Sequence, residues 1–278
     1  MPDVVDAPIT EQEFDQISNL VYQHCGINLH KGKQELVHAR IAKQLHRKRL
    51  NSFADYMRLI QHDPTRKEFL AFIDAITTNL TSFFREPMHY TFLRETLLPA
   101  ILDRQPTTPS LRAWSAGCSS GEEPYSIAMT INEVLNGRIA SDVKILATDL
   151  SNRMLTLGET GVYAKSRMHE VPPHLRAKYF KPFGGQGDAY KVNQDVRNLV
   201  SYRYLNLIQP WPFKGNFDFI FCRNVMIYFD KSTQQKLVTD LYDRLRPGGY
   251  LFTGHSESLS GLDHPFRYVQ PTIYLRTP

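Results

Sequence analysis

Residues 111–124 read LRAWSAGCSSGEEP, a short apolar run that ends in a glycine-rich turn and leads into a helical pattern. Such a turn between a strand and a helix lets a ligand approach the backbone closely, because glycine carries no Cβ. The spacing of Gly117 and Gly121 is GxxxG, and Glu122 and Glu123 stand where a dinucleotide pyrophosphate would need bare amides. The turn is either an ordinary βα turn or a ligand site. As a ligand site, it predicts a cationic or hydroxyl-rich ligand, and the paired acids disfavour a dehydrogenase.

A second apolar run, 143–148, ends in Asp149. An acid at the tip of the second strand of such a sheet is placed to accept hydrogen bonds from ribose hydroxyls. Asp149 lies 32 positions after Gly117, whereas the usual interval is about 20 residues, so taken alone it is equally well a helix cap. Together with the glycine turn it favours a ribose site.

Three further apolar runs, 200–205, 217–222 and 250–253, have helical or turn signals between them. This alternation is typical of βαβ units and predicts a mostly parallel sheet. Residues 268–275, broken at Pro271, predict an edge strand. Residues 160–198 are too long for a simple crossover, and they predict an inserted antiparallel β-subdomain.

The region before the first strand has a helical period throughout. Thr10 and Glu13 form the capping box of a first helix, and a second helix is expected over 33–49. We predict a helical domain at 1–90, a linker helix and linker at 91–110, and an α/β domain at 111–278, with the linker proper at Pro106–Pro109.

The net charge of the 278-residue chain is +5, and it is unevenly distributed. Residues 31–50 hold seven basic side chains and one acidic one, a local charge of +6 that leaves the rest of the chain at −1. On a helical wheel Arg40, Lys43 and Arg47 gather beside an apolar stripe, which predicts an amphipathic helix with a basic face. That face is either simply solvated or a docking surface for an acidic partner.

Composition excludes several classes of protein. With 42% hydrophobic residues the chain is a globular protein with a sizeable core. No apolar run reaches the roughly 18 residues that span a bilayer, and residues 1–10 lack the features of a secretory signal. Three widely spaced cysteines without a CxxC pair, and histidines without ligand spacing, suit a reducing cytosol and predict no metal site.

The order of the later motifs narrows the fold further. The strand 217–222 ends in Arg223 and Asn224, a helix follows, and the turn Pro247–Gly249 opens the next strand. This order is the pattern of the Rossmann-like class I methyltransferases that depend on S-adenosylmethionine. The predicted fold is therefore α/β, with a small all-helical N-terminal domain, such a methyltransferase domain, and the inserted β-subdomain.

Several motifs together resemble one family, the CheR-type chemotaxis receptor methyltransferases. The motifs are TNLTSFFRE (78–86), WSAGCSSGEEPYSIA (114–128), ATDL (147–150), NL (206–207), FCRNVMIYF (221–229) and GHSES (254–258). The first and the fifth are highly specific, and the resemblance covers nearly the whole chain.

The resemblance implies a cytoplasmic, monomeric protein-glutamate O-methyltransferase that uses S-adenosylmethionine, releases S-adenosylhomocysteine and acts on the cytoplasmic signalling domain of chemoreceptors. In some members of the family the β-subdomain captures a receptor C-terminal peptide. It implies catalytic roles for Arg85 and Tyr228, and it leaves open which of the two adjacent glutamates contacts the cofactor. The implied cofactor contacts are Asn79, Thr81, Arg85, Glu122 or Glu123, Asp149, Asn206, Leu207, Arg223 and Asn224.

The residues fit this activity on chemical grounds. A glutamate carboxylate has a reference pKa of about 4.3, so it is ionised at neutral pH and needs no general base. Methyl transfer then requires alignment and exclusion of water, and Arg85 can orient a carboxylate with its fork of donors. The structural alternatives are an ion pair of Arg85 with Glu86 or a neighbour, and a core position for Tyr228 with its hydroxyl satisfied. Cys222 and His255 receive no chemical role.

Two other functions remain to be weighed. A nucleic-acid methyltransferase would use the basic helix on phosphates, but the chain lacks an NPPY-type motif at Asn224–Ile227 and has no aromatic residues interleaved with the basic run. A cofactor-sensing adaptor without catalysis would not need Arg85 and Tyr228. Docking of acidic receptor helices on Arg40, Lys43 and Arg47 is therefore the favoured use of the basic face.

Overall fold

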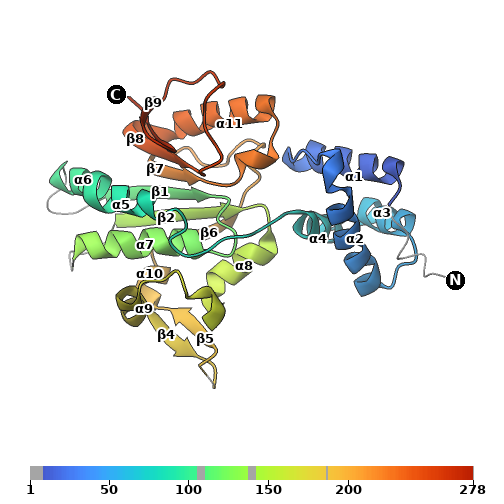
Figure 1. Cartoon of the computed structure of the whole chain (residues 1–278), viewed down its shortest axis with the longest axis horizontal. Coiled ribbons are helices and arrows are strands. Elements are labelled where there is room, and N and C mark those ends of the chain that lie inside the picture. The colour runs from blue at the N-terminus through green and yellow to red at the C-terminus, as the bar shows by residue number, and fades with distance from the viewer. Residues whose placement is uncertain (1–8, 105–109, 137–141, 186, 278) are drawn as a thin grey trace. The chain divides into compact units, whose positions relative to one another are not determined.

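A computed structural model describes residues 9–104, 110–136, 142–185 and 187–277 of the chain (Figure 1). The linker predicted at 106–109 and most of the N-terminal stretch 1–10 lie outside the described residues. The chain divides into two compact units, of which the first comprises residues 1–78 and 228–233 and the second comprises 79–227 and 234–278. No helix among the described residues is long and apolar enough to cross a membrane.

The first unit is helical. Its elements are α1 (Glu11–Cys25), the 3₁₀ turn η2 (Lys31–Lys33), α2 (Gln34–Lys48), α3 (Phe53–His62) and α4 (Lys67–Ile76). The predicted capping box is confirmed, because the Thr10 side chain accepts from the Glu13 amide and the Glu13 carboxylate accepts from the Thr10 amide. One apolar stripe from each helix is buried, including Ile17 of α1, Ile41 of α2 and Phe72 of α4.

A short segment from much later in the chain, 228–233, completes this helical unit. The Asn28 amide donates to the Tyr228 carbonyl at 2.8 Å, Ile27 forms a β-bridge with Phe229, and the Tyr22 hydroxyl donates to Asp230 at 2.6 Å. The predicted α/β domain, 111–278, includes this segment. The structure corrects that boundary, since the partners of the segment lie on and after α1.

A seven-stranded sheet forms the centre of the second unit, in the order β6-β2-β1-β7-β8-β10-β9. Its strands are β1 (Ser110–Ala116), β2 (Asp142–Asp149), β6 (Val200–Tyr204), β7 (Phe217–Cys222), β8 (Leu245–Thr253), β9 (Arg267–Gln270) and β10 (Ile273–Leu275). The first five are parallel to one another, and β10 pairs antiparallel to both β8 and β9. The predicted α/β class is confirmed. The single edge strand expected over 268–275 is instead a hairpin of two strands, β9 and β10, and only β9 lies at the edge of the sheet.

The strand register brings three predicted motifs to one edge of the sheet. Ala116 at the end of β1 lies opposite Thr148 of β2 and opposite Cys222 of β7. The residues that follow these strands therefore meet at the carboxyl edge of the sheet. The chain order reverses at β1, whose neighbours are β2 and β7, and ligands of open α/β sheets bind at such switch points.

Helices on both sides of the strands complete the second unit. They are α5 (Pro87–Phe92), the π-helical turn η3 (Leu93–Leu97), α6 (Leu98–Arg104), α7 (Glu122–Leu135), α8 (Asn152–Thr160), the 3₁₀ turn η5 (Met226–Tyr228) and α11 (Lys231–Arg244). The last two begin or end in the segment that belongs to the first unit.

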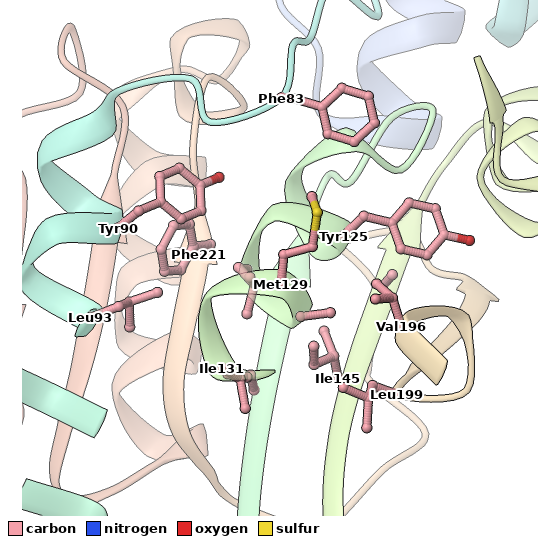
Figure 2. Close-up of a cluster of buried hydrophobic side chains, with 14 of the residues drawn as sticks. Phe83, Tyr90, Leu93, Tyr125, Met129, Ile131, Ile145, Val196, Leu199 and Phe221 are labelled. Carbon is pink, nitrogen blue, oxygen red and sulfur yellow. The ribbon is translucent and has the colours of Figure 1, made fainter. Parts of the chain in front are cut away.

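The predicted domain boundary at residue 90 lies too late. Figure 2 shows Phe83, Tyr90 and Leu93 within the buried cluster that surrounds α7 and the strands, and the Tyr90 ring lies 5.9 Å from that of Phe221 on β7. Residues 79–104 therefore belong to the α/β unit and not to a linker. Apolar packing decides this, and a helical period alone does not reveal which core a helix joins.

The inserted antiparallel subdomain is confirmed. It contains a three-stranded sheet, β3-β5-β4, and its elements are β3 (Val162–Ala164), the 3₁₀ turn η4 (Lys165–Arg167), α9 (Pro173–Tyr179), β4 (Phe180–Phe183), β5 (Ala189–Val192) and α10 (Gln194–Arg197). Phe180 and Tyr163 both pack edge-on against Phe83, so the subdomain shares the core of the second unit.

Candidate functional site

The glycine-rich turn after β1 is held in an unusual backbone conformation. Gly117, Ser119 and Gly121 all have positive φ angles, of 81°, 49° and 94°. The Gly117 amide donates to the Thr148 carbonyl at 2.8 Å, so the turn is tied to the end of β2. Left-handed non-glycine residues cost of order 1–3 kcal/mol each and gather at functional sites, which makes this turn the candidate ligand cradle.

Asp149 fixes the cradle from the neighbouring strand. One carboxylate oxygen accepts from the Ser119 amide and the other from the Ser151 amide, both at 2.8 Å. Its side chain is buried, and Ser151 is itself the N-cap of α8. The carboxylate therefore has one fixed orientation at the carboxyl edge of the sheet, as a ribose ligand requires.

The two glutamates of the turn have different surroundings. The Glu123 carboxylate accepts from the Ser115 hydroxyl and from Arg223 Nε, each at 2.7 Å. Glu122 accepts from the Ser120 hydroxyl through Oε2 at 2.8 Å. Both oxygens of Glu123 are thus engaged within the protein.

Glu122 keeps one oxygen without a well-directed donor. Its Oε1 lies 2.6 Å from Arg167 Nη2, but this buried atom has no partner in hydrogen-bond geometry among the described residues. Burial raises the pKa of Glu122, and the nearby Arg167 guanidinium opposes that rise. A fully buried carboxylate with an acceptor position that no described residue fills in hydrogen-bond geometry could take a donor from a ligand, which favours Glu122 over Glu123 as the cofactor contact.

Arg223 is the centre of a buried polar network. Its guanidinium donates to Glu123, to the Arg85 carbonyl at 2.5 Å and to Glu86 at 3.3 Å. Its Nη1 also lies 3.2 Å from His89 Nδ1. Burial, and then the Arg223 charge, lowers the pKa of His89 to about 3, so this imidazole is neutral at physiological pH.

The network corrects two expectations about individual side chains. Glu86 pairs with Arg223, and none of the ion pairs among the described residues includes Arg85, so the alternative of an ion pair of Arg85 with Glu86 or a neighbour is not supported. The Arg223 guanidinium is engaged by protein groups and its residue is only 5% exposed. A cofactor contact by this guanidinium is therefore not supported, and Arg223 is better described as the residue that positions the 79–86 segment and the cradle.

The 79–86 segment is held by hydrogen bonds from other parts of the second unit along its length. The Ser119 hydroxyl donates to the Asn79 carbonyl at 2.9 Å, and Arg167 donates to the Thr81 carbonyl at 3.3 Å. The Phe84 amide donates to the Ser126 hydroxyl at 3.0 Å. Asn79 and Thr81, two predicted contacts, are thus held beside the glycine-rich turn.

Arg85 itself is half-buried, and its guanidinium donates to the Leu80 carbonyl at 3.1 Å within the same segment. The flanking residues Phe84 and Glu86 have positive φ angles of 52° and 59°. The backbone around Arg85 is therefore strained and fixed, while its side chain lacks the carboxylate partner that a structural arginine would have among the described residues. Its catalytic role stays a prediction.

Asn206 and Leu207 follow β6 in a tight turn. The Asn206 side chain accepts from the Ile208 amide at 3.3 Å, and the Leu207 carbonyl accepts from the Trp211 indole at 3.2 Å. Trp211 packs edge-on against Trp114 of β1, with ring centroids 4.8 Å apart. An aromatic cluster thus fixes this turn after the strand next to β2.

Asn224 begins the turn after β7, and a residue that the sequence analysis did not single out holds it there. Asn224 has a φ of 59°, and its amide donates to the buried carboxylate of Glu257 at 2.6 Å. Glu257 belongs to the GHSES motif. No pattern in the sequence marks it as the partner of a turn 33 residues earlier.

Tyr228, the second predicted catalytic residue, belongs to the first unit. Its carbonyl accepts from Asn28, and Lys33 Nζ lies 5.8 Å from the centroid of its ring. It is half-buried, so the alternative of a fully buried core aromatic is not supported. Cys222 is buried within β7, as expected, and the His255 backbone amide donates to Glu86.

The basic face of α2 is smaller than predicted. Lys43 and Arg47 are exposed, but Arg40 is half-buried and donates to the Ile76 carbonyl and to the Thr78 hydroxyl. Burial lowers the pKa of Arg40. A cation at the end of α4 stabilises the helix dipole, so Arg40 is an internal anchor and the docking prediction narrows to Lys43 and Arg47.

Two family models match almost the whole chain. Residues 12–77 match the CheR methyltransferase all-alpha domain, and residues 79–275 match the CheR methyltransferase SAM binding domain. The junction of the two models falls where the structure divides into its units.

Several curated proteins are similar over nearly their full length. The chain is 39% identical over 267 residues to "Chemotaxis protein methyltransferase 2" of Pseudomonas aeruginosa, covering 95% of this chain and 93% of the relative. It is 37% identical over 270 residues to the "Chemotaxis protein methyltransferase" of Borreliella burgdorferi, covering 96% and 94%. The protein of the same name from Escherichia coli is 36% identical over 268 residues, covering 96% and 91%.

Proposed function

The chain belongs to the CheR methyltransferase family, and on that premise we propose that it methylates glutamate side chains of chemoreceptors, with S-adenosylmethionine held at the carboxyl edge of the sheet. The observation that carries the proposal is the cradle of Gly117–Gly121. There a strained backbone, the fixed carboxylate of Asp149 and the buried carboxylate of Glu122 meet at the switch point of the sheet.

The residues present fit that cofactor, which supplies an activated methyl group on a sulfonium centre. We assign the ribose hydroxyls to Asp149 and the cationic amino group to Glu122, whose Oε1 has no well-directed donor among the described residues. Asn79, Thr81, Asn206, Leu207 and Asn224 line the same edge as further candidate contacts. The Arg223 guanidinium takes no part in binding and fixes the backbone of Arg85.

The chemistry asks little of the protein beyond positioning. A substrate glutamate is ionised at neutral pH, so no side chain has to remove a proton. What remains is alignment and exclusion of water. We expect Arg85 to orient a carboxylate, since its side chain is accessible while its backbone is fixed. Arg223 donates to the Arg85 carbonyl, and the neighbouring Phe84 amide donates to Ser126. Tyr228 is expected to support the reacting carboxylate by one hydrogen bond.

Labelled S-adenosylmethionine tests the activity. The protein is incubated with receptor-containing membranes and, in parallel, with receptor-free membranes and nucleic acid. Base-labile label on the receptor is the expected result, because glutamate methyl esters hydrolyse in alkali. Label in nucleic acid, base-stable label on the receptor, or no label at all would contradict the proposal.

We further propose that Lys43 and Arg47 of α2 dock acidic receptor helices. Reversing both to Glu is expected to raise the KM for receptor about tenfold at low salt, since complementary charge steers association. The difference from the wild type should shrink as salt is added, because exposed charges are screened. Steady-state methylation kinetics over a salt series measure both effects.

The matched control reverses Lys214 and Lys236, two exposed lysines of the second unit, and makes the same change of net charge. Its KM for receptor should stay within about twofold of the wild type. Equal effects of the two double variants would show that only the net charge matters. Arg40 is left unchanged, since its substitution would loosen α4.

The β-subdomain is the proposed capture site for an acidic receptor C-terminal peptide. Residues 160–198 hold seven Lys or Arg and three Asp or Glu, a charge of +4. Lys181 and Lys191 lie directly opposite each other on β4 and β5, an arrangement that destabilises a sheet unless an anion is near. Phe183, on the same side of β4 as Lys181, is 46% exposed, and Lys191 Nζ lies 5.5 Å from its ring centroid.

A labelled peptide ending in two acidic residues and one aromatic residue probes this face. Replacing Lys181 and Lys191 by Glu is expected to weaken its binding at least tenfold in a fluorescence anisotropy titration, because attraction becomes repulsion. Lys165 is an exposed residue elsewhere in the subdomain, and Lys165→Glu should alter the affinity for the peptide by less than threefold. If the wild type and the double variant bind the peptide with equal affinity, the proposed peptide capture by this face of the β-subdomain is wrong.

We also place the protein in the cytoplasm as a monomer. The signalling domain that it would methylate is cytoplasmic, and the three cysteines are free and buried, as suits a reducing compartment. Light scattering of the purified protein at several concentrations tests the oligomeric state, and a concentration-dependent mass of twice 32.1 kDa would contradict it.

A further inference from the structure

Glu257 is a buried carboxylate whose hydrogen bonds come from backbone amides. It is 4% exposed, and it accepts from the amides of Asn224 at 2.6 Å, Gly254 at 2.7 Å and Ile227 at 3.2 Å. None of the ion pairs within the described residues includes it. Burial raises its pKa, and the backbone hydrogen bonds oppose that rise. A buried charge is costly unless its hydrogen bonds are made, so the turn and the carboxylate stabilise each other.

The turn that Glu257 holds is strained and tightly packed. Asn224 has a left-handed φ of 59°. A Cβ added to Gly254 would lie 2.7 Å from the Glu257 carboxylate and 2.7 Å from the Asn224 side-chain nitrogen. Gly254 is therefore required by close approach, since any side chain at this position would separate Glu257 from the turn.

The same turn contacts the cofactor cradle. A Cβ on Gly117 would lie 2.4 Å from Val225 Cγ2, so the Val225 side chain lies directly on the glycine that opens the cradle. Asn224 is a candidate cofactor contact, and the chain continues from Ile227 directly into Tyr228. The position of Asn224 and Val225 therefore depends on the hydrogen bonds that Glu257 accepts from the backbone amides.

We propose that Glu257 is a positioning residue for methyl transfer. Its buried carboxylate accepts from the surrounding backbone amides, here called the amide nest, and thereby fixes the 224–227 turn against the glycine cradle. This inference rests on the proposed methyltransferase function. It assigns Glu257 no contact with substrate or cofactor. Its effect is to hold the backbone of Asn224 in a conformation that the turn would not keep alone.

Glu257→Gln tests the inference. The substitution replaces one of the two carboxylate oxygens by an NH2 group, which cannot accept the backbone N–H groups that point at it. We expect kcat to fall about 10- to 100-fold and the KM for receptor to stay within threefold, since the proposed docking residues lie on α2. Hydrogen exchange within 224–227 should accelerate at least tenfold, because the amides of Asn224 and Ile227 lose the carboxylate that accepts from both of them.

Leu259→Val is the matched control. Leu259 is fully buried in the same segment, so its truncation lowers Tm without touching the nest, and kcat and exchange at 224–227 should remain near wild type. Gly254→Ala provides a second variant that keeps the carboxylate but forces it from the turn, and it should reproduce the Glu257→Gln phenotype. If Glu257→Gln does not fold, Glu257→Asp and Gly254→Ala carry the same comparison.

The outcomes separate this inference from the proposed function. A wild-type protein that methylates no receptor defeats the proposed function, whatever the variants do. An active wild type, together with Glu257 and Gly254 variants that keep wild-type kcat or wild-type exchange at 224–227, overturns the positioning role alone. A fall in kcat that Leu259→Val matches at equal loss of Tm also overturns it.

Discussion

Replacing Asp149 with alanine is expected to weaken binding of S-adenosylhomocysteine by about 100-fold or more. A hydrogen bond to a charged group contributes roughly 1.5–3 kcal/mol, and two such bonds to ribose hydroxyls account for an effect of that size. The variant also removes the acceptor of the Ser119 amide, so the strained turn loses one of its ties. Isothermal titration calorimetry measures the change.

Asp142→Ala is the control for this effect. Asp142 begins the strand that Asp149 ends, and it pairs with Arg112 at the opposite edge of the sheet. Its removal should leave the dissociation constant within twofold. A dissociation constant for Asp149→Ala within threefold of wild type would remove Asp149 from the cofactor site.

Replacing Arg223 with methionine is expected to lower Tm by about 10 °C. Removing one partner of a buried ion pair lowers the free energy of unfolding by about 3–5 kcal/mol. For a unit of this size, each kcal/mol lowers Tm by roughly 2–4 °C. Here one cation lies beside two buried carboxylates, Glu86 and Glu123, and the variant leaves both without it. Differential scanning fluorimetry measures Tm, and methylation of receptor should be lost because Arg223 holds the Arg85 backbone.

Two comparisons identify the cause. Arg246→Met breaks a pair with Asp218 in which the arginine is 40% exposed, and such pairs contribute only about 0–1 kcal/mol. Adding Glu86→Gln and Glu123→Gln to Arg223→Met should restore at least half of the lost Tm without restoring activity. If Arg223→Met lowers Tm no more than Arg246→Met, the buried network does not stabilise the fold.

The parts of the fold that the sequence predicted are those governed by local patterns. The strands at 111–116 and 217–222 are short, mostly apolar runs, and the Thr10–Glu13 capping box is a signal of four residues. The boundary near residue 90 was wrong because the helices after it have the same period as those before it. Only the packing of Tyr90 and Leu93 on the sheet assigns them to the second unit.

The candidate site was predictable where a motif and a strand end coincide, as at Asp149. It was not predictable where a side chain acts across the chain. Arg40 belongs by pattern to a basic helix face, but its guanidinium is used at the end of α4. Arg223 pairs with Glu86, 137 residues earlier, and Glu257 accepts from Asn224, 33 residues earlier. Neither spacing nor composition encodes such pairs.

The discontinuous first unit constrains how the protein is made. During synthesis its helices emerge first, but residues 228–233 follow 149 residues after Thr78. At about 5–20 residues per second, the synthesis of the intervening residues takes roughly 7–30 s, and the helical unit lacks its last segment for that time. In that interval the residues that bind Tyr228 and Phe229 are without their partners. Final closure of the N-terminal unit is therefore a late event, coupled to the emergence of β7 and not completed ahead of it.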